Sequence, residues 1–143
     1  MRSPVWIPCL LAACGSEGNP GTMTATVELG GEQVEFERPC TMPHRTDDYN
    51  FYARGGSPHL GFEAIWDKAV ITEPGAYTVS LTGAFIVYVE HDDKISNGFG
   101  SVTFTTYQPE EDLVAGSFEL AVADENPDDP SLIEASGDFE CRN

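Results

Sequence analysis

The chain has 143 residues, of which 7 are basic and 24 acidic, and its formal net charge at pH 7 is −17. A surface this acidic repels phosphate backbones, whose binding depends on Lys and Arg, and it also repels anionic lipid headgroups. The composition therefore excludes a nucleic-acid partner, and the length fits one domain of common size.

The N-terminal segment has the parts of a secretory leader. Arg2 is basic, residues 5–11 form a mainly apolar stretch, and two alanines precede a cysteine. The sequence Leu11-Ala12-Ala13-Cys14 resembles the lipobox of bacterial lipoproteins, in which the cysteine is acylated and becomes the first residue of the mature protein. We predict a lipoprotein signal peptide at residues 1–13 and lipidation at Cys14. The alternative is a buried strand ending in a plain thiol; the run is far shorter than the ~20 apolar residues of a transmembrane helix.

Residues 14–22 are predicted to form the lipidated cysteine and a flexible tether. This stretch is rich in glycine and also holds Ser16, Asn19 and Pro20, which favour neither helix nor strand. A tether of this kind would hold the remaining residues, 23–143, away from the membrane as a single domain.

Period-two alternation of apolar and polar residues dominates the domain. It begins with Ala25, Val27 and Leu29, turns at a Gly-Gly pair, and continues with Val34 and Phe36. Similar alternation recurs at about residues 49–53, 77–81, 102–106, 114–122 and 132–141. Such short strands with frequent turns predict an all-β fold, a single antiparallel β-sandwich of about eight or nine strands.

Two segments of the domain depart from simple period-two alternation. Residues 59–71 fit both a strand and a helical stripe, and we favour the strand because the neighbouring segments are strands and no clear helix N-cap precedes them. Residues 85–89 are apolar at every position, which predicts either a central strand covered on both faces or a strand whose second face meets a loop or a partner. The polar residues 91–98 that follow are predicted to form a loop.

Two of the four cysteines are predicted to form a disulfide. Cys9 lies in the leader and Cys14 would carry lipid, which leaves Cys40 and Cys141. Alternation places both on the apolar faces of their strands, and disulfides form in extracytoplasmic compartments. Two unpaired buried thiols are the alternative, and a metal site is weaker because the chain has no CxxC spacing.

Several further segments resemble small secreted β-type lipoproteins, of which the mycobacterial lipoprotein-antigen family is one example. They are Thr24-Ala-Thr-Val27 leading to Gly31-Glu-Gln-Val34, Pro74-Gly-Ala-Tyr-Thr78, Gly116-Ser-Phe-Glu119 and Ser136-Gly-Asp-Phe139. The resemblance implies a location in the cell envelope and a sandwich fold, and it implies no chemistry.

The sequence offers no catalytic motif, so we predict that the protein is not an enzyme and assign no catalytic residue. HExxH and GxSxG are both absent. The best candidate for ligand chemistry is calcium, because Asp124, Asn126 and Asp128 alternate as in the start of an EF-hand loop. The match then fails, since Asp129 stands where that loop needs glycine and Ala135 where it needs glutamate.

A looser calcium site could still use Asp124, Asp128 and Asp129, and His91-Asp92-Asp93 with Asn97 forms a weaker cluster. Polar hairpin loops rich in turn residues explain both segments without a metal. No other cofactor is expected.

These features together predict a lipid-anchored extracytoplasmic protein, at an outer membrane or cell surface, that attaches to the membrane through the lipid on Cys14. Its expected role is that of a non-catalytic interaction or structural module, with an envelope protein or a polysaccharide as partner. A calcium-binding or calcium-stabilised domain and an enzyme of unrecognised type are the alternatives.

Overall fold

The alternating segments fold into antiparallel strands. The computed structural model describes residues 21–29, 31–43, 47–56, 59–80, 82–91, 94–122 and 133–142. The strands are β1 (Gly21–Leu29), β2 (Glu32–Cys40), β3 (Asp48–Gly55), β4 (Leu60–Asp67), β5 (Gly75–Val79), β6 (Phe85–His91), β7 (Lys94–Asn97), β8 (Phe99–Gln108), β9 (Leu113–Val122) and β10 (Ile133–Arg142). A short 3-10 helix, η2 (Pro109–Glu111), joins β8 to β9.

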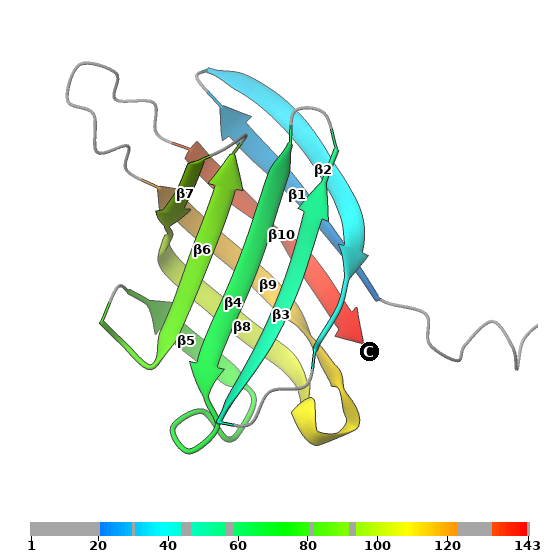
Figure 1. Cartoon of the computed structure of the whole chain (residues 1–143), viewed down its shortest axis with the longest axis vertical. Coiled ribbons are helices and arrows are strands. Elements are labelled where there is room, and N and C mark those ends of the chain that lie inside the picture. The colour runs from blue at the N-terminus through cyan, green and yellow to red at the C-terminus, as the bar shows by residue number, and fades with distance from the viewer. Residues whose placement is uncertain are drawn as a thin grey trace, which may run out of the picture.

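The strands form two antiparallel sheets that pack face to face (Figure 1). The large sheet has six strands in the order β2-β1-β10-β9-β8-β5, and the small sheet has four in the order β3-β4-β6-β7. Figure 1 shows the small sheet in front, with the strands of the large sheet crossing behind it at an angle. The predicted all-β sandwich is confirmed.

The chain crosses between the two sheets four times, namely after β2, before and after β5, and after β7. After β2, Thr41 forms isolated bridges with Tyr52 of β3 and with Arg142 of β10. Between β7 and β8, the Gly98 amide donates to the Val87 carbonyl at 2.8 Å. The bridges at this Thr41 corner link strands of both sheets, whereas the hydrogen bond of Gly98 stays within the small sheet.

The expected number of strands was too low, because the structure has ten strands within the residues it describes. The additional strand, β7, lies inside the predicted polar loop and pairs with the end of β6, from Tyr88↔Asn97 to His91↔Lys94. β1 begins at Gly21, two residues before the predicted start of the domain, and Gly21 pairs in register with Cys40.

The core lies between the two sheets and centres on Trp66 of β4. Its indole stacks on Phe85 with ring centroids 5.4 Å apart, and it packs at a tilt against Phe104 at 5.2 Å. The indole Nε1 donates to the Tyr107 hydroxyl at 2.8 Å, and that hydroxyl donates to the Ile71 carbonyl at 2.6 Å. Aromatic side chains of this size bury 150–250 Å² each and dominate core energetics. They therefore hold β4, β6 and β8 together across the two sheets.

The two segments that depart from simple alternation both contain strands. Residues 60–67 form strand β4, as predicted. β6 lies inside its sheet between β4 and β7, but only one of its faces is fully buried. Phe85, Val87 and Val89 point into the core, whereas Ile86 and Tyr88 are half-buried on the outer face of the small sheet. Within the described part of the chain no second layer covers that outer face, so the expectation of a strand buried on both faces was wrong there; contact of this face with a partner stays a prediction.

The predicted disulfide joins Cys40, the last residue of β2, to Cys141 of β10. Their Cα atoms are 4.6 Å apart, the two residues are separated by 101 positions, and both are 0% exposed. The bridge therefore lies next to the Thr41 corner and closes the part of the chain from the end of β2 to β10 into one loop.

Candidate functional site

The outer face of the large sheet carries the polar half of the alternating strands. In register across four strands, Thr26 of β1 lies beside Ser136 of β10, Ser136 beside Glu119 of β9, and Glu119 beside Ser101 of β8. This row presents hydroxyl groups and one carboxylate to solvent.

The next row along the strands combines carboxylates with an aromatic ring. Gln33 lies opposite Glu28, Glu28 opposite Glu134, Glu134 opposite Ala121, and Ala121 opposite Phe99. Phe99 is 41% exposed, one of three large apolar side chains that the described part of the chain leaves exposed. The row therefore begins with polar groups on β2 and ends with an aromatic ring on β8.

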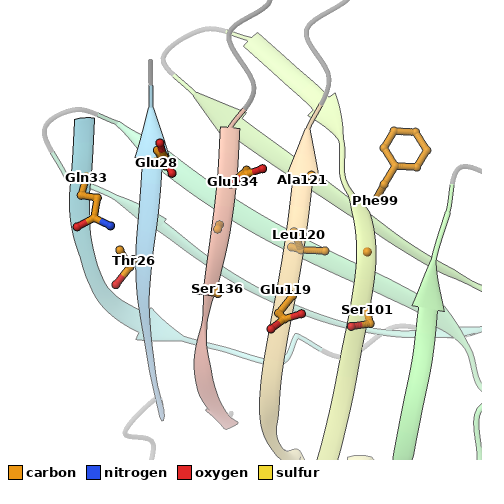
Figure 2. Close-up of a pocket in the computed structure, with 12 residues that line it drawn as sticks. Thr26, Glu28, Gln33, Phe99, Ser101, Glu119, Leu120, Ala121, Glu134 and Ser136 are labelled. Carbon is orange, nitrogen blue, oxygen red and sulfur yellow. The ribbon is translucent and has the colours of Figure 1, made fainter. Parts of the chain in front are cut away.

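A shallow hollow of about 450 Å³ lies over these two rows (Figure 2). Figure 2 shows Glu28, Glu134 and Glu119 rising from three neighbouring strands, with the Phe99 ring projecting at the edge. A second hollow of about 470 Å³ shares Ser101, Glu119 and Ser136 with the first. It continues the polar surface toward Asp138. The two hollows form one surface, which we call the outer-sheet surface.

The outer-sheet surface is strongly negative. Its carboxylates, given by strand pairing, are Glu28, Glu35, Glu37, Glu119, Glu134, Asp138 and Glu140. The one ion pair found on it among the described residues is at its end, where Arg142 Nη2 lies 2.5 Å from Glu140 Oε1. Thr26 Oγ1 donates to Glu35 Oε1 at 3.4 Å. The remaining carboxylates of the surface are therefore available to a cationic partner.

A third hollow, of about 350 Å³, lies at the end of the sandwich near η2 and is lined by Tyr49, Lys68, Tyr107 and Glu110 among others. The Lys68 ammonium lies 4.6 Å from the centroid of the Tyr49 ring. Burial raises the pKa of Tyr49, and the negative charges of Glu110 and Asp112 raise it further. The groups of this hollow already contact one another, so we interpret it as part of the packing at this end.

The hydroxyl of Tyr107 is the polar centre of that end. Burial raises its pKa, and the hydrogen bond from Trp66 acts in the opposite direction. Since Tyr107 both accepts from the indole and donates to Ile71, its hydroxyl is fully engaged in linking β4 to β8.

The residues predicted from sequence as functional fall into two groups. Cys40 and Cys141 are brought together as predicted. Cys14 and the candidate calcium ligands Asp124, Asn126, Asp128 and Asp129 lie outside the described residues, as do Asp92 and Asp93 of the weaker cluster. Within the residues that are described, no three His, Cys, Asp or Glu side chains converge on a possible metal position.

The outer-sheet surface was not predicted from the sequence. Each of its strands shows polar alternation, but the rows depend on the pairing of β1 with β10, which joins Glu28 to Glu134. The available signal was the recurrence of Thr, Ser, Glu and Asp at every second position in residues 22–28, 117–119 and 134–140.

Comparison with known proteins gives no relative: no family model, no curated protein and no solved structure matches this chain. Among the described residues no helix is long and apolar enough to span a membrane.

Proposed function

We propose that this protein is a lipid-anchored extracytoplasmic binding module, held at a membrane by acyl chains on Cys14. The observation that carries the proposal is the fully buried disulfide between Cys40 and Cys141. Disulfides persist in oxidising compartments and are rare in the cytoplasm. The lipobox-like sequence before Cys14 supplies the second argument.

The position of the disulfide suits an anchored domain. Gly21, where β1 begins, pairs in register with Cys40. A tether that ends at Gly21 would enter the domain directly beside the covalent bridge. A load on the tether would then fall on the part of the sandwich that is crosslinked.

The proposed role of the domain is binding without catalysis, with an envelope protein or polysaccharide as partner. The outer-sheet surface spreads its carboxylates and hydroxyls over several strands and is shallow. Small-molecule substrates are usually enclosed in deeper and more apolar pockets. A broad polar face is better suited to contact with another macromolecule.

The anchor is tested by replacing Cys14 in the full-length protein, expressed in a bacterium that processes lipoproteins. Wild-type protein is expected in the membrane fraction, with an intact mass that includes acyl chains and lacks residues 1–13. Cys14→Ser should remove the acyl mass, because serine has no thiol to modify.

Cys9→Ser is the matched control, since it changes a neighbouring thiol inside the predicted leader. It is expected to leave acylation and fractionation unchanged. Recovery of an unmodified full-length wild-type chain from the cytoplasm would contradict the proposal.

A further inference from the structure

The outer-sheet surface contains two carboxylates placed directly opposite each other. Glu28 of β1 and Glu134 of β10 are partners in register on neighbouring antiparallel strands. Cross-strand partners have Cβ atoms about 4.5–5.5 Å apart, and like charges in this position destabilise a sheet. Both side chains are exposed, and neither forms an ion pair with another described residue. A positive group bound between them would relieve this repulsion.

The hollow has the extent of a short extended polypeptide. It is lined by residues from β2 to β8, which are four strand-to-strand steps apart in the sheet. At about 4.8 Å per step the hollow spans about 19 Å. A fully extended chain covers that span with about six residues.

The carboxylates are spread along the hollow rather than gathered at one point. Glu28 and Glu134 lie in one row, and Glu119 lies in the next row and on a third strand. No described group of three acidic or other metal-binding side chains is close enough together to hold a single metal ion. A series of spaced cations therefore matches this arrangement better than a metal ion does.

Phe99 adds a contact of a different kind at one end of the hollow. Its ring is 41% exposed and projects beside Ala121 (Figure 2). A single exposed phenylalanine has no significance by itself. Next to a row of carboxylates, however, its face can receive a guanidinium or ammonium group through a cation–π contact.

We propose that the outer-sheet surface binds a lysine- or arginine-rich segment of an envelope protein in extended form. This inference rests on the proposed function, because it names the partner of the same binding module. The cationic side chains of the segment lie between Glu28, Glu134 and Glu119, and one of them lies over Phe99. Complementary charge supplies the specificity and accelerates association.

The test uses the full-length protein in detergent micelles and a fluorescently labelled peptide of six lysines. The triple variant Glu28→Gln/Glu119→Gln/Glu134→Gln removes three charges from the hollow. Its matched control, Glu73→Gln/Glu110→Gln/Glu111→Gln, removes three exposed charges from other parts of the protein. Both variants have the same net charge, so a difference between them reports the location of the binding site.

The surface variant is expected to bind the hexalysine peptide about tenfold more weakly than wild type, which corresponds to about 1.4 kcal/mol. The control variant is expected to change affinity less than about twofold, since none of its three residues lines the two hollows and salt screens charges that lie farther away. Equal weakening by the two variants would overturn the proposal, because binding would then follow net charge alone. Equally tight binding of a hexaglutamine peptide or of dextran would also overturn it.

Thermal melting gives a second readout on the same proteins. The surface variant is expected to melt at or above the temperature of the control variant, because it removes the repulsion between Glu28 and Glu134. If the triple variant does not fold, Glu134→Gln alone tests the proposal, with an expected loss of affinity of about twofold; unchanged affinity would contradict it.

The two proposals fail separately. If the wild-type protein is acylated at Cys14 but does not bind the peptide through these charges, the cationic partner is rejected and the anchored module remains. Specific peptide binding by a protein that is never acylated would reject the anchor and leave the binding surface.

Discussion

The hydroxyl of Tyr107 forms two hydrogen bonds at the edge of the aromatic core, one with the Trp66 indole and one with the Ile71 carbonyl. Tyr107→Phe removes the acceptor for the Trp66 indole and the donor to the Ile71 carbonyl, so two partly buried groups lose their partner. Leaving a buried polar group without a partner costs about 1–3 kcal/mol. We expect the free energy of unfolding at pH 7 to fall by about that amount, as measured by urea denaturation followed by Trp66 fluorescence.

The same residue predicts a dependence on pH. Burial raises the pKa of Tyr107 in the folded protein, whereas an unfolded tyrosine titrates near 10. The unfolded chain therefore loses this proton first, and stability is complete below about pH 10 and falls as pH rises above it. Tyr107→Phe should show a shallower decline between about pH 9 and pH 11.

The control for both measurements is Tyr88→Phe, which removes a half-buried hydroxyl from the outer face of the small sheet. It should lower stability by less than about 1 kcal/mol, because no hydrogen bond within the core is lost. If the two variants changed stability equally at pH 7 and showed the same decline at alkaline pH, the role assigned to Tyr107 would be contradicted.

At the scale of the strand, glycine decides how closely β8 and β9 approach. A Cβ atom at Gly116 would collide with the carbonyl oxygen of Thr103 on the paired strand. This position lies next to the register shift between Phe104 and Thr106. Gly116→Ala should therefore force backbone movement and lower the free energy of unfolding by about 1–3 kcal/mol, measured by chemical denaturation.

Gly98→Ala is the matched control at the corner between β7 and β8. Its methyl group would have its nearest contact with Val89 Cγ2 at 3.4 Å, which is an ordinary van der Waals distance. The variant should be neutral or more stable by about 0.4–1 kcal/mol, because alanine restricts the unfolded chain. A loss larger than that of Gly116→Ala would show that backbone crowding is not the determining factor.

The strands that were predictable are those in which side chains alone determine the structure. β1, β2 and β9 alternate so regularly that only one face can enter a core, and β4 followed from its neighbours. β7 was missed because Lys94-Ile95-Ser96-Asn97 has a single apolar residue, which is 68% exposed. Backbone pairing with the edge of β6 makes it a strand, and a one-dimensional pattern contains no such information.

The same limit applies to the binding surface. The pairing Glu28↔Glu134 depends on the register of strands more than 100 residues apart. The disulfide could be predicted because only two cysteines remained and both fell on apolar faces. A surface without such a constraint becomes visible only when the register is known.

At the scale of the whole molecule, stability depends on how the two sheets are joined. The sheets meet at the Thr41 corner, where the backbone bridges Tyr52 on one side and Arg142 on the other. Cys40 directly precedes Thr41 and Cys141 directly precedes Arg142, so the disulfide crosslinks the large sheet beside this corner. Covalent and hydrogen-bonded connections are thus concentrated at one end of the sandwich.

Removing the bridge should therefore affect the entire domain. The crosslink spans 101 residues, and closing a loop of about 100 residues stabilises the folded state by about 4.7 kcal/mol in the chain-entropy model. For a domain with a total stability of about 5–15 kcal/mol this is a large fraction. We expect Cys40→Ala/Cys141→Ala to lower the free energy of unfolding by about 3–5 kcal/mol in urea denaturation. Reduced wild-type protein should match the double variant, and the variant itself should not respond to the reductant. A variant that unfolds at the same urea concentration as oxidised wild type would show that hydrogen bonding at the Thr41 corner is sufficient to hold the sheets together.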